Sequence, residues 1–171
     1  MYFTLSDEVL LALAQIAVSI IGFSGVVVTL GRAEKERWSA SELLQLRTLV
    51  EPSMVVLLGS LLPLLIALAD VSPEHLWRVA NAGLLGLHAI GHGLFLARGA
   101  KHKSAVTRSQ QIISAMSVLV YVAQFASVFN VIRFQELTFL IGLLYALWIS
   151  IHNFYLLLFG RSNLVTDHST D

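Results

Sequence analysis

The chain has no cysteine and few charged residues. Of its 171 residues, 13% are Asp, Glu, Lys or Arg, whereas about 25% is usual for a soluble domain. Without cysteine there is no disulfide, no thiolate metal ligand and no cysteine nucleophile. Lys and Arg together number 11, as do Asp and Glu, and this zero net charge gives no reason to expect a nucleic-acid partner. The shortage of charge leaves too little polar surface for a water-soluble fold.

Five long apolar stretches take up most of the chain. They cover residues 9–30, 43–69, 76–97, 111–132 and 137–159. A helix needs about 20 mostly apolar residues to cross the hydrocarbon core of a bilayer. We therefore predict an all-α fold, a polytopic membrane helical bundle with five transmembrane helices. It forms a single integral membrane domain over residues 1–171, in a plasma membrane or a bacterial inner membrane.

Basic residues are unequally shared between the two sides of this predicted bundle. One side, formed by the first and third connections and the C-terminal tail, carries Arg32, Lys35, Arg37, Arg47, Arg98, Lys101, Lys103, Arg108 and Arg161. The other side carries only Arg78 and Arg133. Because short loops rich in Lys and Arg stay in the cytoplasm, we predict an outside N-terminus and a cytoplasmic C-terminus.

Helix-end signals agree with the predicted spans. Capping-box or first-turn signals are found at Ser39 with Glu42, at Ser72-Pro73-Glu74, and at Thr107 with Gln110. Three spans are expected to end where glycine lies beside arginine, at Gly31-Arg32, Arg98-Gly99 and Gly160-Arg161.

Two spans carry a stripe of small or polar residues along one face. In the first span the stripe consists of Ala12, Gln15, Ser19, Gly22, Val26 and Thr29, and in the fourth of Ser114, Ser117, Tyr121 and Gln124. Such stripes let membrane helices approach closely and let amides bond across helices. We predict helix-packing faces, with Gln15 bonded to Gln124 if the two stripes meet. A polar pore lining is the alternative.

Ionisable side chains within the spans define the candidate site, since they are costly in lipid and usually face the bundle interior. The candidates for a metal or proton site are His88, His92, His152 and Glu51, with Asn81 and Arg47 as supporting polar residues. His88 and His92 are four residues apart and so share a helix face. With the predicted orientation and a rise of 1.5 Å per residue, the four candidates lie at one depth, in the cytoplasmic third of the bilayer.

Three chemistries are open to such a group. Imidazoles with a carboxylate suit zinc or another divalent metal, two histidines from different helices suit haem iron, and histidines with a glutamate suit proton transfer. The structural alternative is that each histidine bonds a carbonyl, Ser or Asn on a neighbouring helix. In that case Arg47 and Glu51 form an ion pair within their own helix.

The sequence has no motif for a catalytic nucleophile, a phosphate loop or dinucleotide binding. We therefore expect a non-enzymatic component of transport or sensing, with a His/Glu pocket on the cytoplasmic side for a metal ion, a proton or a small solute. A homo-oligomer or a partner membrane subunit is expected to complete it. The alternatives are a redox protein that holds haem or metal between histidines, and an accessory membrane subunit without a site.

Overall fold

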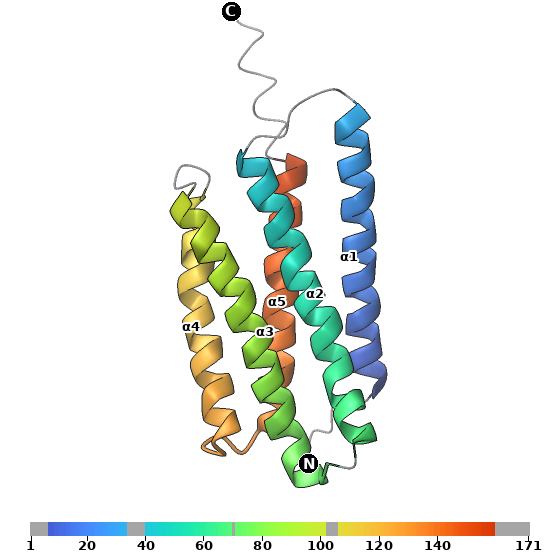
Figure 1. Ribbon diagram of the computed structural model, residues 1–171, viewed down its shortest axis with the longest axis vertical. Coiled ribbons are helices and arrows are strands. Elements are labelled where there is room, and N and C mark those ends of the chain that lie inside the picture. Colours follow the sequence, from blue (N-terminus) through green and yellow to red (C-terminus); the bar gives the residue numbers. More distant parts are fainter. Residues whose placement is uncertain (1–6, 34–39, 70, 102–105, 160–171) are drawn as a thin grey trace, which may run out of the picture.

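The computed structural model describes residues 7–33, 40–69, 71–101 and 106–159. The helices are α1 (Asp7–Ala33), α2 (Ala40–Leu68), α3 (Pro73–Lys101), α4 (Arg108–Val128) and α5 (Gln135–Phe159). Each contains a segment that is long and apolar enough to cross a membrane. The predicted all-α membrane bundle of five spans is therefore confirmed (Figure 1).

Four of the helices form the body of the bundle. α2 packs against α3 and α5, α4 packs against the same two helices, and α3 also contacts α5. α1 lies at one side and packs mainly on α2 (Figure 1). The interior space between α2, α3, α4 and α5 is therefore the part of the molecule where side chains from several helices can meet.

The apolar core lies where α2, α3 and α5 come closest. Leu84 and Phe139 are completely buried there, as is Leu143. Gly59 on α2 permits this approach, because a Cβ atom at that position would lie 2.7 Å from Leu143 Cδ2 and 3.0 Å from Leu84 Cδ1. Close contact of this kind is how small residues hold membrane helices together.

The connection between α4 and α5 begins earlier than the sequence indicated. The fourth apolar stretch was expected to remain helical to residue 132, but α4 ends at Val128. Asn130 has φ 60°, a left-handed conformation that asparagine adopts more readily than most residues. Arg78 Nε of α3 donates to the Val128 carbonyl at 3.1 Å, which satisfies one of the carbonyls left free at the helix end.

The helix-end predictions had mixed outcomes. The capping box is present, with the Thr107 side chain accepting from the Gln110 N–H at 3.3 Å and the Gln110 side chain accepting from the Thr107 N–H at 3.1 Å. α3 begins at Pro73, as expected. The expected stop at Gly99 is wrong, because α3 continues to Lys101 and no described glycine has a positive φ. Likewise α1 passes through Gly31-Arg32 to Ala33, whereas Ser39 and Gly160-Arg161 lie outside the described residues.

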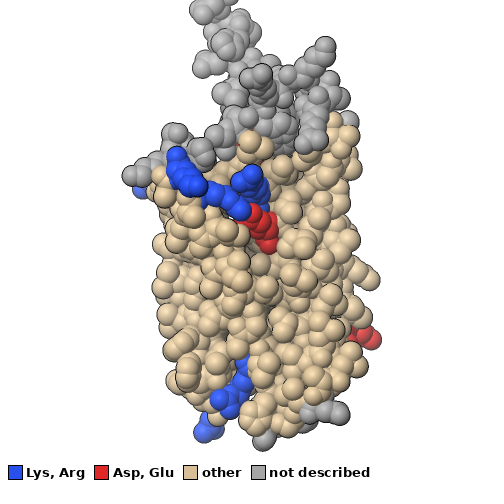
Figure 2. All heavy atoms as spheres, in the orientation of Figure 1, with Lys and Arg blue, Asp and Glu red and all other residues tan. Residues whose placement is uncertain are grey.

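The described basic residues Arg47, Arg98, Lys101 and Arg108 lie at the end of the bundle where α2 and α4 begin and α3 ends. We call this the basic end. Figure 2 shows Lys and Arg gathered towards the two ends of the visible face, with a broad uncharged belt between them. Such a belt fits a segment surrounded by lipid, and the assignment of the basic end to the cytoplasm stays a prediction.

The stripe on α1 does not pack within a single copy of the chain. Gln15, Ser19 and Gly22 are exposed. α1 instead buries Leu10, Leu13, Ala14 and Ala17. The expected pair of Gln15 and Gln124 is not formed, since Gln124 is fully buried and bonds to His88. The apolar face of α1 is therefore the one that meets α2.

Candidate functional site

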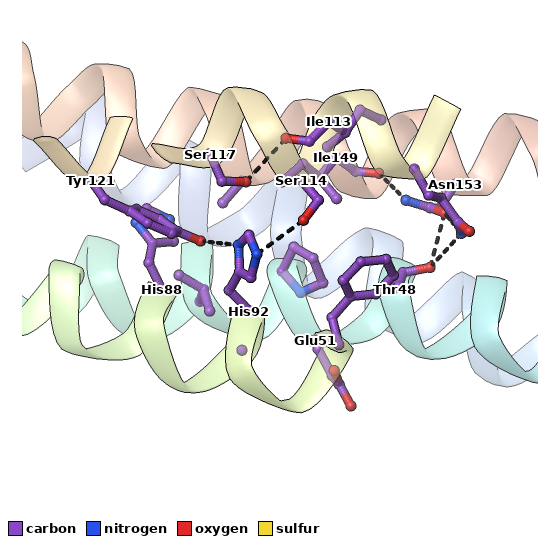
Figure 3. A pocket seen from close by; sticks show the side chains of 16 residues that line it. Thr48, Glu51, His88, His92, Ile113, Ser114, Ser117, Tyr121, Ile149 and Asn153 are labelled. Carbon is purple, nitrogen blue, oxygen red and sulfur yellow. Dashed lines mark hydrogen bonds between the residues drawn. The ribbon is translucent and has the colours of Figure 1, made fainter. Parts of the chain in front are cut away.

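A cavity of about 90 Å³ lies among α2, α3, α4 and α5, towards the basic end (Figure 3). Its polar lining residues are Thr48, Glu51, His88, His92, Gln110, Ser114, Ser117, Tyr121 and Asn153. The remaining lining residues are Pro52, Val55, Gly91, Phe95, Ile113, Ala146 and Ile149. All four helices of the bundle body contribute, so the cavity depends on the tertiary fold and not on one helix.

Three of the predicted site residues line this cavity and one does not. His88 and His92 from α3 and Glu51 from α2 are part of its wall. His152 is not, and its ring lies beside that of Trp148, with centroids 6.0 Å apart. The next residue, Asn153, lines the cavity instead, because one residue of an α-helix turns the side chain by about 100°.

The two supporting residues also lie away from the cavity. Asn81 is fully buried nearer the opposite end of α3, where its Nδ2 donates to the carbonyls of Trp77 at 2.8 Å and Gln135 at 3.0 Å. It ties α3 to the start of α5 and is thus a packing residue. Arg47 is exposed and is not part of the lining.

His92 is the centre of a short hydrogen-bonded chain. Its Nδ1 lies 2.9 Å from the Tyr121 hydroxyl and its Nε2 lies 3.0 Å from the Ser114 hydroxyl. Figure 3 shows the ring held between these two side chains of α4. Since a hydroxyl can both donate and accept, both nitrogens of a neutral imidazole are satisfied.

His88 has only one of its ring nitrogens satisfied. The residue is 7% exposed, and its Nδ1 lies 3.1 Å from Gln124 Oε1. An amide oxygen can only accept, so Nδ1 carries the proton and Nε2 presents a lone pair. Nε2 is buried and has no partner among the described residues.

Several other buried side-chain atoms also lack a partner. Within the described part of the chain they are Ser60 Oγ, Asn81 Oδ1, Gln124 Nε2, Ser127 Oγ and His152 Nε2. None of these residues lines the cavity. His88 Nε2 is therefore the one such atom that belongs to a cavity residue.

A second polar cluster crosses the cavity nearer the basic end. Asn153 Oδ1 accepts from Thr48 Oγ1 at 2.9 Å and from Gln110 Nε2 at 3.0 Å, and Asn153 Nδ2 donates to the Ile149 carbonyl at 2.9 Å. It links α2, α4 and α5. The sequence reasoning missed this cluster because Thr48 and Asn153 have no charge, and because Gln110 was interpreted only as a cap.

Glu51 forms its ion pair with Arg98 on α3. The expected pair with Arg47 is not formed, because the last turns of α3 bring the Arg98 guanidinium to the level of Glu51. The Glu51 and Arg98 side chains are 28% and 26% exposed, so the pair lies at the outer edge of the cavity. Figure 2 shows acidic and basic side chains touching at the surface near the basic end.

Three of the cavity-lining side chains, His88, His92 and Glu51, are of types that ligate metals. Among the residues that the structure describes, no three His, Cys, Asp or Glu side chains lie together in a way that could hold a metal ion. Haem iron takes its axial ligands from opposite faces of the ring, whereas both cavity histidines come from α3.

Comparisons with known protein families, with curated proteins and with solved structures give no match to this chain. The class of protein is therefore defined by its fold alone, a membrane protein with five transmembrane helices.

Proposed function

We propose that this protein is a non-enzymatic component of membrane transport or sensing that binds a proton or a small polar solute in the α2–α5 cavity. The observation that carries the proposal is His88 Nε2, a buried acceptor atom without a partner whose residue lines the cavity. Burying a polar group without a hydrogen bond costs about 1–3 kcal/mol in proteins. A solute that donates a hydrogen bond to this atom offsets that cost, and the same lone pair is where a proton binds.

The chain through His92 supports the same function. Tyr121, His92 and Ser114 form a continuous chain of hydrogen bonds. Each hydroxyl in it can act either as donor or as acceptor, depending on which nitrogen of His92 carries the proton. His88 and Tyr121 are neighbours, with ring centroids 5.7 Å apart. A proton or polar molecule at His88 is thus next to groups that can reorient in response, as a transport or sensing step requires.

We further propose that the protein works as a homo-oligomer, in which α1 supplies part of the contact. Gln15 lies on the exposed face of α1 together with Ser19 and Gly22. Lipid offers no hydrogen bond to the Gln15 amide, whereas a second helix does. A Cβ atom added at Gly22 would meet nothing within 4 Å, so the face has room for a close helix contact.

The proton-binding proposal is tested with His88→Gln, and His152→Gln is the matched control because His152 is also intramembrane but does not line the cavity. The chain is reconstituted in vesicles that contain a pH-sensitive dye, and proton entry is followed under an imposed potassium diffusion potential. In parallel, the histidine side-chain ¹⁵N signals are titrated by NMR. We expect proton entry or a cavity titration in the native chain and in His152→Gln, and its loss in His88→Gln.

The proton-binding proposal is wrong if His88→Gln leaves both the proton entry and the titration unchanged. It is equally wrong if the native chain shows neither of them.

A further inference from the structure

Among the residues that the structure describes, the basic end of the bundle, towards which the cavity lies, carries more positive than negative charge. Arg98 already pairs with Glu51 there, while Lys101 and Arg108 lie at the same end of the bundle. The one other acidic side chain described at that end is Glu42. An anion that approaches this end of the bundle is therefore attracted to it, and at the cavity edge the cation that it meets is Arg98, paired with Glu51.

Behind the ion pair, much of the cavity wall is apolar. Pro52, Phe95 and Ile149 are part of this wall. Most of the polar lining groups bond to one another, as in the Thr48, Gln110 and Asn153 cluster, and so are already satisfied. A guest with an apolar body therefore loses little by entering, since it displaces no hydrogen bond between the wall groups.

We infer that the cavity binds a small amphipathic anion, whose carboxylate or phosphate group pairs with Arg98 while its apolar part enters between α2 and α3. This inference rests on the cavity being a binding site, as the proposed function holds, and adds the chemical class of the ligand. Arginine is suited to the role because its guanidinium binds carboxylate and phosphate groups through two parallel hydrogen bonds.

Binding requires that Glu51 release Arg98, and the chain provides another partner for Glu51. Arg47 lies one turn earlier on α2, is exposed, and forms no ion pair with Glu51 in the structure. Residues four apart on a helix are neighbours. Glu51 thus moves from Arg98 to Arg47 as the anion arrives, and no carboxylate is left without a cation.

The absence of cysteine makes the test direct, since a single introduced thiol is the only one in the chain. Gly91→Cys places it in the cavity wall, and Gly93→Cys on the same helix is the matched control outside the lining. A Cβ atom at either position meets nothing within 4 Å. Both variants, in phosphatidylcholine vesicles, are alkylated with a small maleimide in the presence of hexanoate, hexanol or hexylamine.

We expect hexanoate to slow alkylation of Gly91→Cys about tenfold when its concentration is about ten times the Kd, since few cavities then remain empty. Gly93→Cys should react at an unchanged rate. Hexanol and hexylamine should protect Gly91→Cys less than hexanoate. Protection by hexylamine alone, or equal protection of both thiols by hexanoate, would overturn the inference, as would a Gly91→Cys thiol that never reacts.

Two further variants, each made in the Gly91→Cys chain, separate the anion site from a merely structural ion pair. Arg98→Gln should abolish the protection by hexanoate, and Arg98→Lys should restore part of it. Glu51→Gln breaks the same ion pair but frees Arg98, so the protection should appear at a lower hexanoate concentration. If Glu51→Gln weakens the protection as Arg98→Gln does, the pair is structural and the inference fails.

The lipid composition of the vesicles distinguishes the two possible sources of the anion, a lipid headgroup and a free amphipathic anion. If phosphatidylglycerol vesicles protect Gly91→Cys without hexanoate, the ligand is a lipid headgroup, and if they do not, it is a free amphipathic anion. If His88 titrates as proposed but hexanoate gives no protection, the ligand class is wrong and the proposed function stands. If hexanoate protects while His88→Gln has no effect, the proton-binding role fails and the anion site stands.

Discussion

Gly142 on α5 is the position where one added methyl group should disturb the candidate site most. A Cβ atom there would overlap Gln124 Nε2 and would lie 3.0 Å from Leu84 Cδ2. Gln124 is fully buried and holds His88 through the 3.1 Å bond to Nδ1. In Gly142→Ala the amide therefore has to move, and the bond to His88 is broken or lengthened.

The expected loss in the free energy of unfolding follows from three terms. Overpacking a tight core costs about 1–3 kcal/mol, and a lost buried hydrogen bond adds about 1 kcal/mol. Replacing glycine by alanine within a helix returns up to about 1 kcal/mol. We expect a net destabilisation of about 1–3 kcal/mol, which corresponds to roughly a five- to 150-fold change in the unfolding equilibrium constant.

The assay is unfolding in mixed micelles by increasing the fraction of a denaturing detergent, followed by circular dichroism. Gly86→Ala is the control, because a Cβ atom at Gly86 meets nothing within 4 Å. The double variant Gly142→Ala with Gln124→Ala should lose less stability than the two single variants added together, since the shortened side chain removes the clash. If Gly142→Ala is as stable as the native chain and its His88 titration is unchanged, the described packing of Gln124 is incorrect.

Two further variants test other parts of the same framework with the same unfolding assay. Asn153→Leu should destabilise the protein by about 1–3 kcal/mol, because it removes the closer acceptor of the buried Gln110 Nε2 and leaves the Thr48 hydroxyl to donate only within its own helix. The neighbouring His152→Leu, outside the cavity, is its control, and equal effects would contradict the proposed link among α2, α4 and α5. Thr107→Ala should cost about 1 kcal/mol through loss of the α4 capping box, whereas Thr107→Ser, which keeps the hydroxyl, should cost little, and an equal loss in both would refute the capping role.

The fold was predictable because the bilayer imposes one simple requirement on each helix. A span needs about 20 apolar residues, and the five stretches with that property coincide with the five helices. The Thr107 and Gln110 signal also gave the start of α4 correctly. The end of α4 was not predictable from hydropathy, because apolar residues continue through Val131 and Ile132 after the helix has ended.

The level of the candidate site along the bundle was predictable from the sequence, but the direction in which its side chains point was not. Rise per residue placed His88, His92 and Glu51 at one level, and the structure brings these three to one cavity. It could not decide between His152 and Asn153, which differ in depth by only about 1.5 Å but point about 100° apart. Which of the two faces the cavity depends on how α5 is rotated against its neighbours, and that is decided by side chains distant in sequence, such as Leu143 against Gly59.

The two cavity histidines also show why a polar residue in a membrane helix is not by itself evidence of a site. His92 satisfies both nitrogens within the bundle, through Tyr121 and Ser114, and would be accounted for as a packing residue if it stood alone. His88 differs, because its bond to Gln124 fixes the proton on Nδ1 and leaves Nε2 as a bare acceptor in a residue that lines the cavity. Packing alone does not require that atom, since apolar side chains in place of both His88 and Gln124 would avoid the cost of burying unpaired polar groups. The histidine that is less completely bonded is therefore the stronger candidate for function.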